Sequence, residues 1–166
     1  MKLRQMIALG AALLLLPTGC GDKKVVAPTE APSSGKLKWL TNFETAKALA
    51  LTQNKTLLIN FTGSDWCPPC MMLEKEVFKQ PEFAAYAAKH LVLLEVDFPH
   101  VKMQSLEEKA TNEKLAEQFG IEGFPTVVLL DASGQPLGAL GYEPGGPKPF
   151  LNTIEKAREA DATSTP

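Results

Sequence analysis

Two cysteines three positions apart, Cys67 and Cys70, stand where a strand-like run gives way to a helix-like run. The strand run, 56–61, is apolar with little alternation, which is typical of a strand covered on both faces of a sheet. The run that follows, 67–78, repeats its apolar residues at helical spacing. An α/β sheet usually presents its site at such a strand-to-helix junction. The junction therefore predicts an α/β fold with the cysteine pair at its functional edge.

Strand and helix signals alternate through the rest of the chain. Strands are expected at 37–40, 56–61, 91–97, 126–130 and 137–140, and helices at 41–51, 67–78, 81–86, 105–119 and 147–157. Thr41 and Glu44 have the spacing of a capping box at the start of the first helix. This order calls for a central mixed sheet with helices on both faces.

The first 19 residues have the pattern of an export signal peptide. Two basic residues precede an apolar stretch, 6–16, and small residues then lead to Cys20. The apolar stretch is too short to span a bilayer, which disfavours a retained transmembrane helix. The segment 16–20 resembles a bacterial lipoprotein signal, although Pro17 stands where such signals usually carry an apolar residue such as Leu. That resemblance implies that cleavage leaves Cys20 lipid-modified; the alternative is an ordinary secretory signal with an incidental cysteine.

The segment 20–36 has the Pro, Ser and Gly content of a linker. A coil of about 16 residues has an r.m.s. reach of roughly 20–25 Å, so a lipidated Cys20 would hold the following domain near a membrane. The folded domain is expected over 37–161, and 162–166 is expected to be a loose polar tail. The formal net charge of -2 provides no basic surface, so nucleic acid is not expected as a partner.

The cysteine pair is better explained by chemistry than by structure. If Cys20 carries lipid, only two cysteines remain, and a staple across so short a loop would restrict the unfolded chain very little. Cys67 is expected at the open helix N-terminus, where free N–H groups and the helix dipole favour a thiolate nucleophile. Cys70, one turn deeper and better shielded, can resolve a mixed disulfide formed at Cys67.

The two residues between the cysteines, Pro68 and Pro69, influence the direction of electron flow. Proline fits the first helical turn, but these two prolines remove two amide donors that would otherwise stabilise the Cys67 thiolate. A less stabilised thiolate means a less stabilised reduced form, which makes the couple more reducing. The motif therefore favours a reductase over a strong oxidant.

Two motifs resemble those of the thioredoxin-fold family, in particular the exported branch that includes the C-terminal domain of the periplasmic thiol-disulfide interchange reductase. The motifs are Trp66-Cys67-Pro68-Pro69-Cys70 and Gly123-Phe124-Pro125-Thr126. The resemblance covers about 37–160 and implies a thioredoxin fold. It also implies that the peptide bond before Pro125 is cis, that Phe124, Pro125 and Thr126 line a substrate groove, and that Trp66 shields Cys67.

The chain departs from the family pattern at two places. Thioredoxins proper carry a buried acid on the strand that leads to the active site, whereas alignment places Asn60 there. Because an amide cannot accept a proton, help for Cys70 would come from water or from another carboxylate, and Glu95 and Asp97 are the candidates. Both could equally be ordinary polar residues at a strand end. The family's helix proline after the second cysteine is also missing.

The leading hypothesis is a membrane-anchored, extracytoplasmic thiol-disulfide oxidoreductase of the bacterial periplasm. It would reduce disulfides of exported proteins with the Cys67–Cys70 pair and no further cofactor, and it would receive electrons from a transmembrane donor. The alternatives are a copper or zinc handling module that uses the same two sulfurs, and a redox-inert interaction domain. His90 and His100 lie far from the cysteines in sequence and lack zinc-ligand spacing, so no metal site is expected.

Overall fold

The computed structural model describes residues 37–164. The predicted signal peptide 1–19, the linker 20–36 and its lipid attachment site Cys20 lie outside the described residues, as do 165 and 166.

A five-stranded mixed sheet forms the centre of the fold, with strand order β1-β3-β2-β4-β5. The strands are β1 (Trp39–Leu40), β2 (Thr56–Thr62), β3 (Leu91–Asp97), β4 (Thr126–Leu130) and β5 (Pro136–Leu140). β3 pairs in parallel with β1 and β2, whereas β4 is antiparallel to both β2 and β5. Every residue of β2 is buried, including the polar Asn60, as the mainly apolar run with little alternation predicted. The expected mixed sheet is confirmed.

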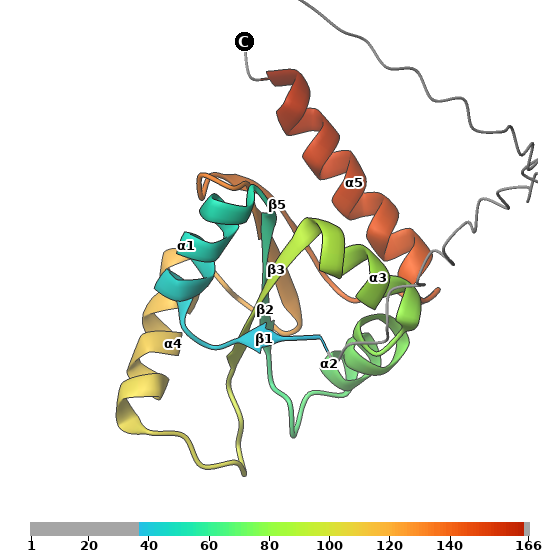
Figure 1. Ribbon diagram of the computed structural model, residues 1–166. Coiled ribbons are helices and arrows are strands. Elements are labelled where there is room, and N and C mark those ends of the chain that lie inside the picture. The colour runs from blue at the N-terminus through green and yellow to red at the C-terminus, as the bar shows by residue number, and fades with distance from the viewer. Residues whose placement is uncertain (1–36, 165–166) are drawn as a thin grey trace, which may run out of the picture. The chain divides into compact units, whose positions relative to one another are not determined.

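Helices cover both faces of this sheet, and each face has its own hydrophobic cluster. The helices are α1 (Phe43–Gln53), α2 (Pro68–Leu73), the π-helix η1 (Glu74–Phe78), α3 (Pro81–His90), α4 (Leu106–Gln118) and α5 (Pro147–Ser164). Figure 1 shows α1 and α4 on one side of the strands and α2, α3 and α5 on the other. The cysteine-bearing α2 therefore shares its layer with α3 and α5.

The expected capping box of the first helix is wrong. Asn42, not Thr41, is the N-cap of α1, because its side-chain oxygen accepts a hydrogen bond from the backbone N–H of Thr45 at 2.8 Å. Asn and Thr are both favourable capping residues, so propensity alone does not separate two neighbouring candidates.

Several helices differ in extent from the sequence prediction; α1 is shifted by two residues, and α3 runs on to His90 where 81–86 was expected. The expected helix 67–78 is an α-helix only as far as Leu73 and continues as the π-helix η1. α5 runs to Ser164 and so includes the first three residues of the expected loose tail. Alanines are frequent at the end of α5 and no Gly or Pro stops the helix before Pro166, which explains the extension.

Within residues 37–164, no helix combines the length and the apolar character needed to cross a membrane.

Candidate active site

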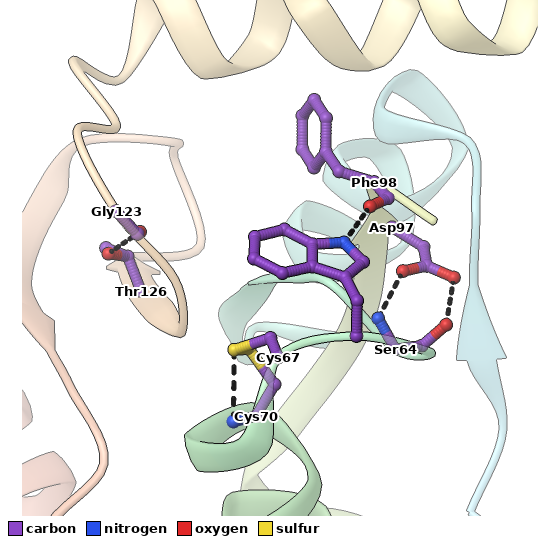
Figure 2. The surroundings of a disulfide bond; sticks show 8 residues. Ser64, Cys67, Cys70, Asp97, Phe98, Gly123 and Thr126 are labelled. Carbon is purple, nitrogen blue, oxygen red and sulfur yellow. Dashed lines mark hydrogen bonds between the residues drawn. A yellow bond between two sulfur atoms is a disulfide. The ribbon is translucent and has the colours of Figure 1, made fainter. Parts of the chain in front are cut away.

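A disulfide joins Cys67 to Cys70 at the start of α2, shortly after the end of β2, with 5.3 Å between the two Cα atoms. Cys67 is the N-cap of α2, and its Sγ accepts a hydrogen bond from the backbone N–H of Cys70 at 3.3 Å (Figure 2). A donor aimed at this sulfur favours the thiolate when the pair is reduced. The position of Cys67 at the helix N-terminus is as the sequence predicted.

The two cysteines are almost equally buried, with 3% of Cys67 and 4% of Cys70 exposed. The expectation that Cys70 is the better shielded of the pair is therefore wrong. The reason is a turn in which the backbone N–H of Cys67 donates to the Gly63 carbonyl at 3.0 Å, which draws Cys67 back against the end of β2. The two cysteines differ in what surrounds them and not in exposure: the Cys67 sulfur accepts a backbone hydrogen bond, and Cys70 lines a cavity.

Pro68 and Pro69 occupy the first turn of α2 and are exposed. Neither has a backbone N–H, so Cys70 carries the first amide donor of the helix. The Cys67 sulfur consequently receives the one amide hydrogen bond described above from within its own motif. This arrangement agrees with the sparse stabilisation of the thiolate that the sequence predicted.

Trp66 is held by contacts with two other loops. Its indole Nε1–H donates to the Phe98 carbonyl at 2.7 Å, which Figure 2 shows as a dashed line. The indole also stacks on the His100 ring and meets the Phe124 ring edge-on, with ring centroids 4.4 Å and 5.9 Å apart respectively. Trp66 remains 38% exposed, so its free face can contact a partner.

His100 lies beside the active site, although its distance from the cysteines in sequence suggested otherwise. The loop that carries it is fastened by Asp65, whose carboxylate accepts the backbone N–H groups of His100, Val101 and Lys102 at 2.8–2.9 Å. These hydrogen bonds, led by that of the His100 amide, lower the pKa of Asp65 to about 2. The sequence signal for this role is an Asp in a short Gly-Ser-Asp loop, where such side chains commonly bind backbone amides.

Asp97, one of the two candidate proton acceptors, braces the active-site loop. Its two carboxylate oxygens accept hydrogen bonds from the backbone N–H and the hydroxyl of Ser64 at 2.9 and 2.6 Å (Figure 2). The Lys102 ammonium donates to the Ser64 hydroxyl at 2.7 Å and lies 3.8 Å from Asp97. Both oxygens of Asp97 are thus occupied by the loop that precedes Cys67.

The peptide bond between Phe124 and Pro125 is cis, as the family resemblance implied. Thr126, the first residue of β4, donates its hydroxyl to the Gly123 carbonyl at 2.8 Å and thereby closes the turn around the proline. Figure 2 shows Gly123 and Thr126 on one side of the disulfide, with Ser64 and Asp97 on the other. The role of Phe124, Pro125 and Thr126 as a substrate groove stays a prediction.

A partly open cavity of about 300 Å³ borders the second cysteine, and Cys70, Asn60 and Glu95 are among its lining residues. The Asn60 side-chain oxygen is buried and has no hydrogen-bond partner among residues 37–164. Burial raises the pKa of the Glu95 carboxyl, and the negative charges of Asp97 and Glu74 add to the effect. Cys70 therefore shares this pocket with a buried amide and with a carboxyl whose pKa is raised.

In the part of the chain that the structure describes, no three or more His, Cys, Asp or Glu side chains are grouped so that they could hold a metal ion. For the metal-handling alternative, the described residues thus offer no ligand cluster beyond the two sulfurs.

The mixed sheet, the cysteine pair after β2 and the cis-proline before β4 define the thioredoxin fold. The family model for a thioredoxin-like domain matches residues 43–158. The chain belongs to the thioredoxin-like family, and it is a thiol-disulfide oxidoreductase.

Within this family, the chain is similar to two kinds of bacterial protein. It is 31% identical over 152 residues to the disulfide bond reductase DsbH of Chlamydia pneumoniae, a match that covers 89% of this chain and 91% of DsbH. A solved structure of a DsbH oxidoreductase superposes with a TM-score of 0.72 and covers 84% of this chain and 94% of that one. The thiol:disulfide interchange protein DsbD of Vibrio vulnificus is 30% identical over 138 residues, but this chain spans only 21% of its length.

Proposed function

We propose that this oxidoreductase reduces disulfides of exported proteins on the outer side of a bacterial membrane, to which Cys20 anchors it. The observation that carries the proposal is the similarity to the disulfide bond reductase DsbH, which extends over 91% of that protein. Thiol-disulfide exchange at Cys67 and Cys70 needs no cofactor beyond the cysteine pair itself. A transmembrane dithiol donor would return the enzyme to its reduced form.

The site supports the reducing direction. Pro68 and Pro69 leave the Cys70 amide as the donor to the Cys67 sulfur from within the motif. A thiolate with few donors stabilises the reduced form weakly, and this lowers the reduction potential. In the proposed reaction, Cys67 attacks the disulfide of the client protein, and Cys70 then releases the client by resolving the mixed disulfide.

The direction of electron flow is tested by equilibrating the Cys67–Cys70 pair with glutathione and quantifying the two redox forms after acid quenching. We expect a potential near that of thioredoxin, about -270 mV. A potential at or above that of protein disulfide isomerase, about -180 mV, would contradict the reductase function. The measurement needs no client protein, because the reduction potential is a property of the enzyme alone.

The anchor and the location rest on residues 1–36. The test is to express the full chain in a bacterium that processes lipoproteins, with the Cys20→Ala variant as the matched control. Native chain in the membrane fraction, with a lipid-sized mass increase on Cys20, supports the proposal. Equal distribution of the two chains between the soluble and membrane fractions contradicts it.

A further inference from the structure

Glu95 and Asn60 stand side by side in the sheet and share a cavity with Cys70. β2 and β3 run parallel, and Asn60 is the register partner of Glu95. Partners in register point to the same face of a sheet, so the two side chains project together toward the layer that contains α2. The cavity that they line with Cys70 measures about 300 Å³, which is room for several water molecules.

The resolving step needs a base at this position. Cys70 must lose its thiol proton before its sulfur can attack the mixed disulfide at Cys67, because the thiolate is the nucleophile. Asn60 has no proton-accepting group of suitable basicity, and its buried side-chain oxygen lacks a protein partner among the described residues. That oxygen can accept a hydrogen bond from water in the cavity and so hold the water beside Cys70.

Three carboxylates lie near the cavity, and two of them are engaged elsewhere. Both oxygens of Asp97 are bound by Ser64. Glu74 forms an exposed ion pair with Lys79 at 3.5 Å. Within residues 37–164, the Glu95 carboxylate has no hydrogen-bond or salt-bridge partner, so it is the one of these three that is not already engaged.

We propose that Glu95, acting through water in this cavity, accepts the proton of the Cys70 thiol during resolution of the mixed disulfide. The family places an acid on the strand of Asn60; in this chain the acid is on the neighbouring strand and serves the same cavity. The inference rests on thiol-disulfide exchange at the cysteine pair, and it holds for either direction of electron flow.

The Cys67 thiolate attacks a client disulfide, forms a mixed disulfide with one client sulfur and expels the other as a thiolate. The Cys70 thiol passes its proton through water to the Glu95 carboxylate, and the Cys70 thiolate attacks the Cys67 sulfur. The Cys67–Cys70 bond forms, the client sulfur leaves with the electron pair, and the two-electron reduction of the client is complete. When a donor dithiol reduces the enzyme, protonated Glu95 returns the proton to the departing Cys70 sulfur.

The charges around Glu95 suit this exchange. Burial and the negative charges of Asp97 and Glu74 raise the pKa of Glu95, while the Lys102 ammonium lowers it. Lys79, which also lines the cavity, is paired with Glu74. A carboxyl with a raised pKa is a closer match to a thiol than an ordinary carboxyl, which favours proton exchange between the two groups.

The test is a single-turnover measurement with reduced enzyme and an aromatic disulfide that releases the coloured thiol 2-nitro-5-thiobenzoate. The first release reports attack by Cys67 and the second reports resolution by Cys70. In Glu95→Gln, we expect the second phase at neutral pH to slow roughly 10- to 100-fold with the first phase unchanged, because the internal base is missing. The low-pH inflection of the second phase, due to Glu95, should disappear as well.

The control is Glu113→Gln, the same substitution on the exposed face of α4, which should keep both phases within about twofold of the native rates. A rescue variant combines Glu95→Gln with Asn60→Asp and so moves the carboxylate one strand across the same cavity. It should recover the fast second phase and its inflection. If Glu95→Gln does not fold, Glu95→Asp replaces it and should slow the second phase less while keeping the inflection.

Identical second phases and pH profiles in the native and Glu95-substituted enzymes would overturn the role of Glu95. So would a slowing that is equal at every pH, since that indicates a structural effect. A native enzyme that releases only one thiol has no working cysteine pair, which contradicts the exchange activity itself and is thereby distinguished from failure of the Glu95 proposal.

Discussion

The ring of His100 stacks on the indole of Trp66, with 4.4 Å between the ring centroids and 5° between the ring planes. This stack joins the residue that precedes the nucleophile to the loop between β3 and α4. Asp65 fastens the same loop through three backbone N–H groups, and the Phe98 carbonyl accepts the indole N–H. The active-site tryptophan is thus positioned by a neighbouring loop and not by its own motif alone.

Replacement of Asp65 by Ala should release this loop. Three charge-assisted hydrogen bonds disappear, so the Trp66 indole loses its stacking partner and the melting temperature falls. The measurement is Trp66 fluorescence and thermal unfolding in a Trp39→Phe background, which leaves a single tryptophan. Asp65→Asn keeps one oxygen acceptor and should show a smaller change; an Asp65→Ala chain with native fluorescence would contradict the fastening role.

The Asp65 hydrogen bonds also make the attachment of this loop dependent on pH, because they require the ionised carboxylate. The pKa of Asp65 is about 2 in the folded chain against an ordinary value of 3.8, so its contribution to stability is fully present above about pH 4. That contribution is lost as the pH falls through about 2, where the folded-state carboxylate becomes protonated. The stability should therefore begin to decline below about pH 4, and Trp66 fluorescence of the folded chain should change as the pH falls through about 2. The Asp65→Ala chain should lack this transition.

The cysteine roles predict opposite outcomes for two serine variants. Cys67→Ser should reduce the turnover of a model disulfide to the uncatalysed background, because the nucleophile is gone. Cys70→Ser should form a mixed disulfide with the same substrate that persists, because the resolving thiol is absent. Mass spectrometry of the quenched reaction checks both outcomes. Equal and mild losses in the two variants would show that the division of roles is wrong.

Gly63→Ala should displace Trp66. A Cβ at this position would lie 2.6 Å from the indole Nε1 and 2.5 Å from Cε2, far inside contact distance. We expect a stability loss of about 1–3 kcal/mol, typical of overpacking, together with altered Trp66 fluorescence. Gly123→Ala is the matched control, since a Cβ there meets nothing within 4 Å, and its stability should stay within about 0.5 kcal/mol of native. Urea unfolding curves compare the three chains.

Local sequence was sufficient for the parts of the fold that depend on near neighbours. The apolar run of β2, the helix start at Pro81 and the N-cap position of Cys67 follow from residue type and spacing within one element. The capping residue of α1 was missed because Thr41 and Asn42 have similar local preferences, so propensity does not separate them.

The cis bond before Pro125 was predicted only through the family resemblance, because no local pattern requires it. The π turns of η1 were not predicted either. Val77 and Phe78 of η1 are buried in a hydrophobic cluster to which residues of other elements contribute, and a local pattern does not show these contacts.

By itself, the sequence determined the α/β class, the junction that presents Cys67 and Cys70, and the absence of an acid at Asn60. Only the tertiary structure decided that His100 lies on Trp66, that Asp97 braces the loop, and that Glu95 shares the cavity of Cys70. These relationships join residues 25 or more positions apart. Their geometry follows from strand register and loop closure, which depend on the whole sheet, so no local pattern in the chain encodes them.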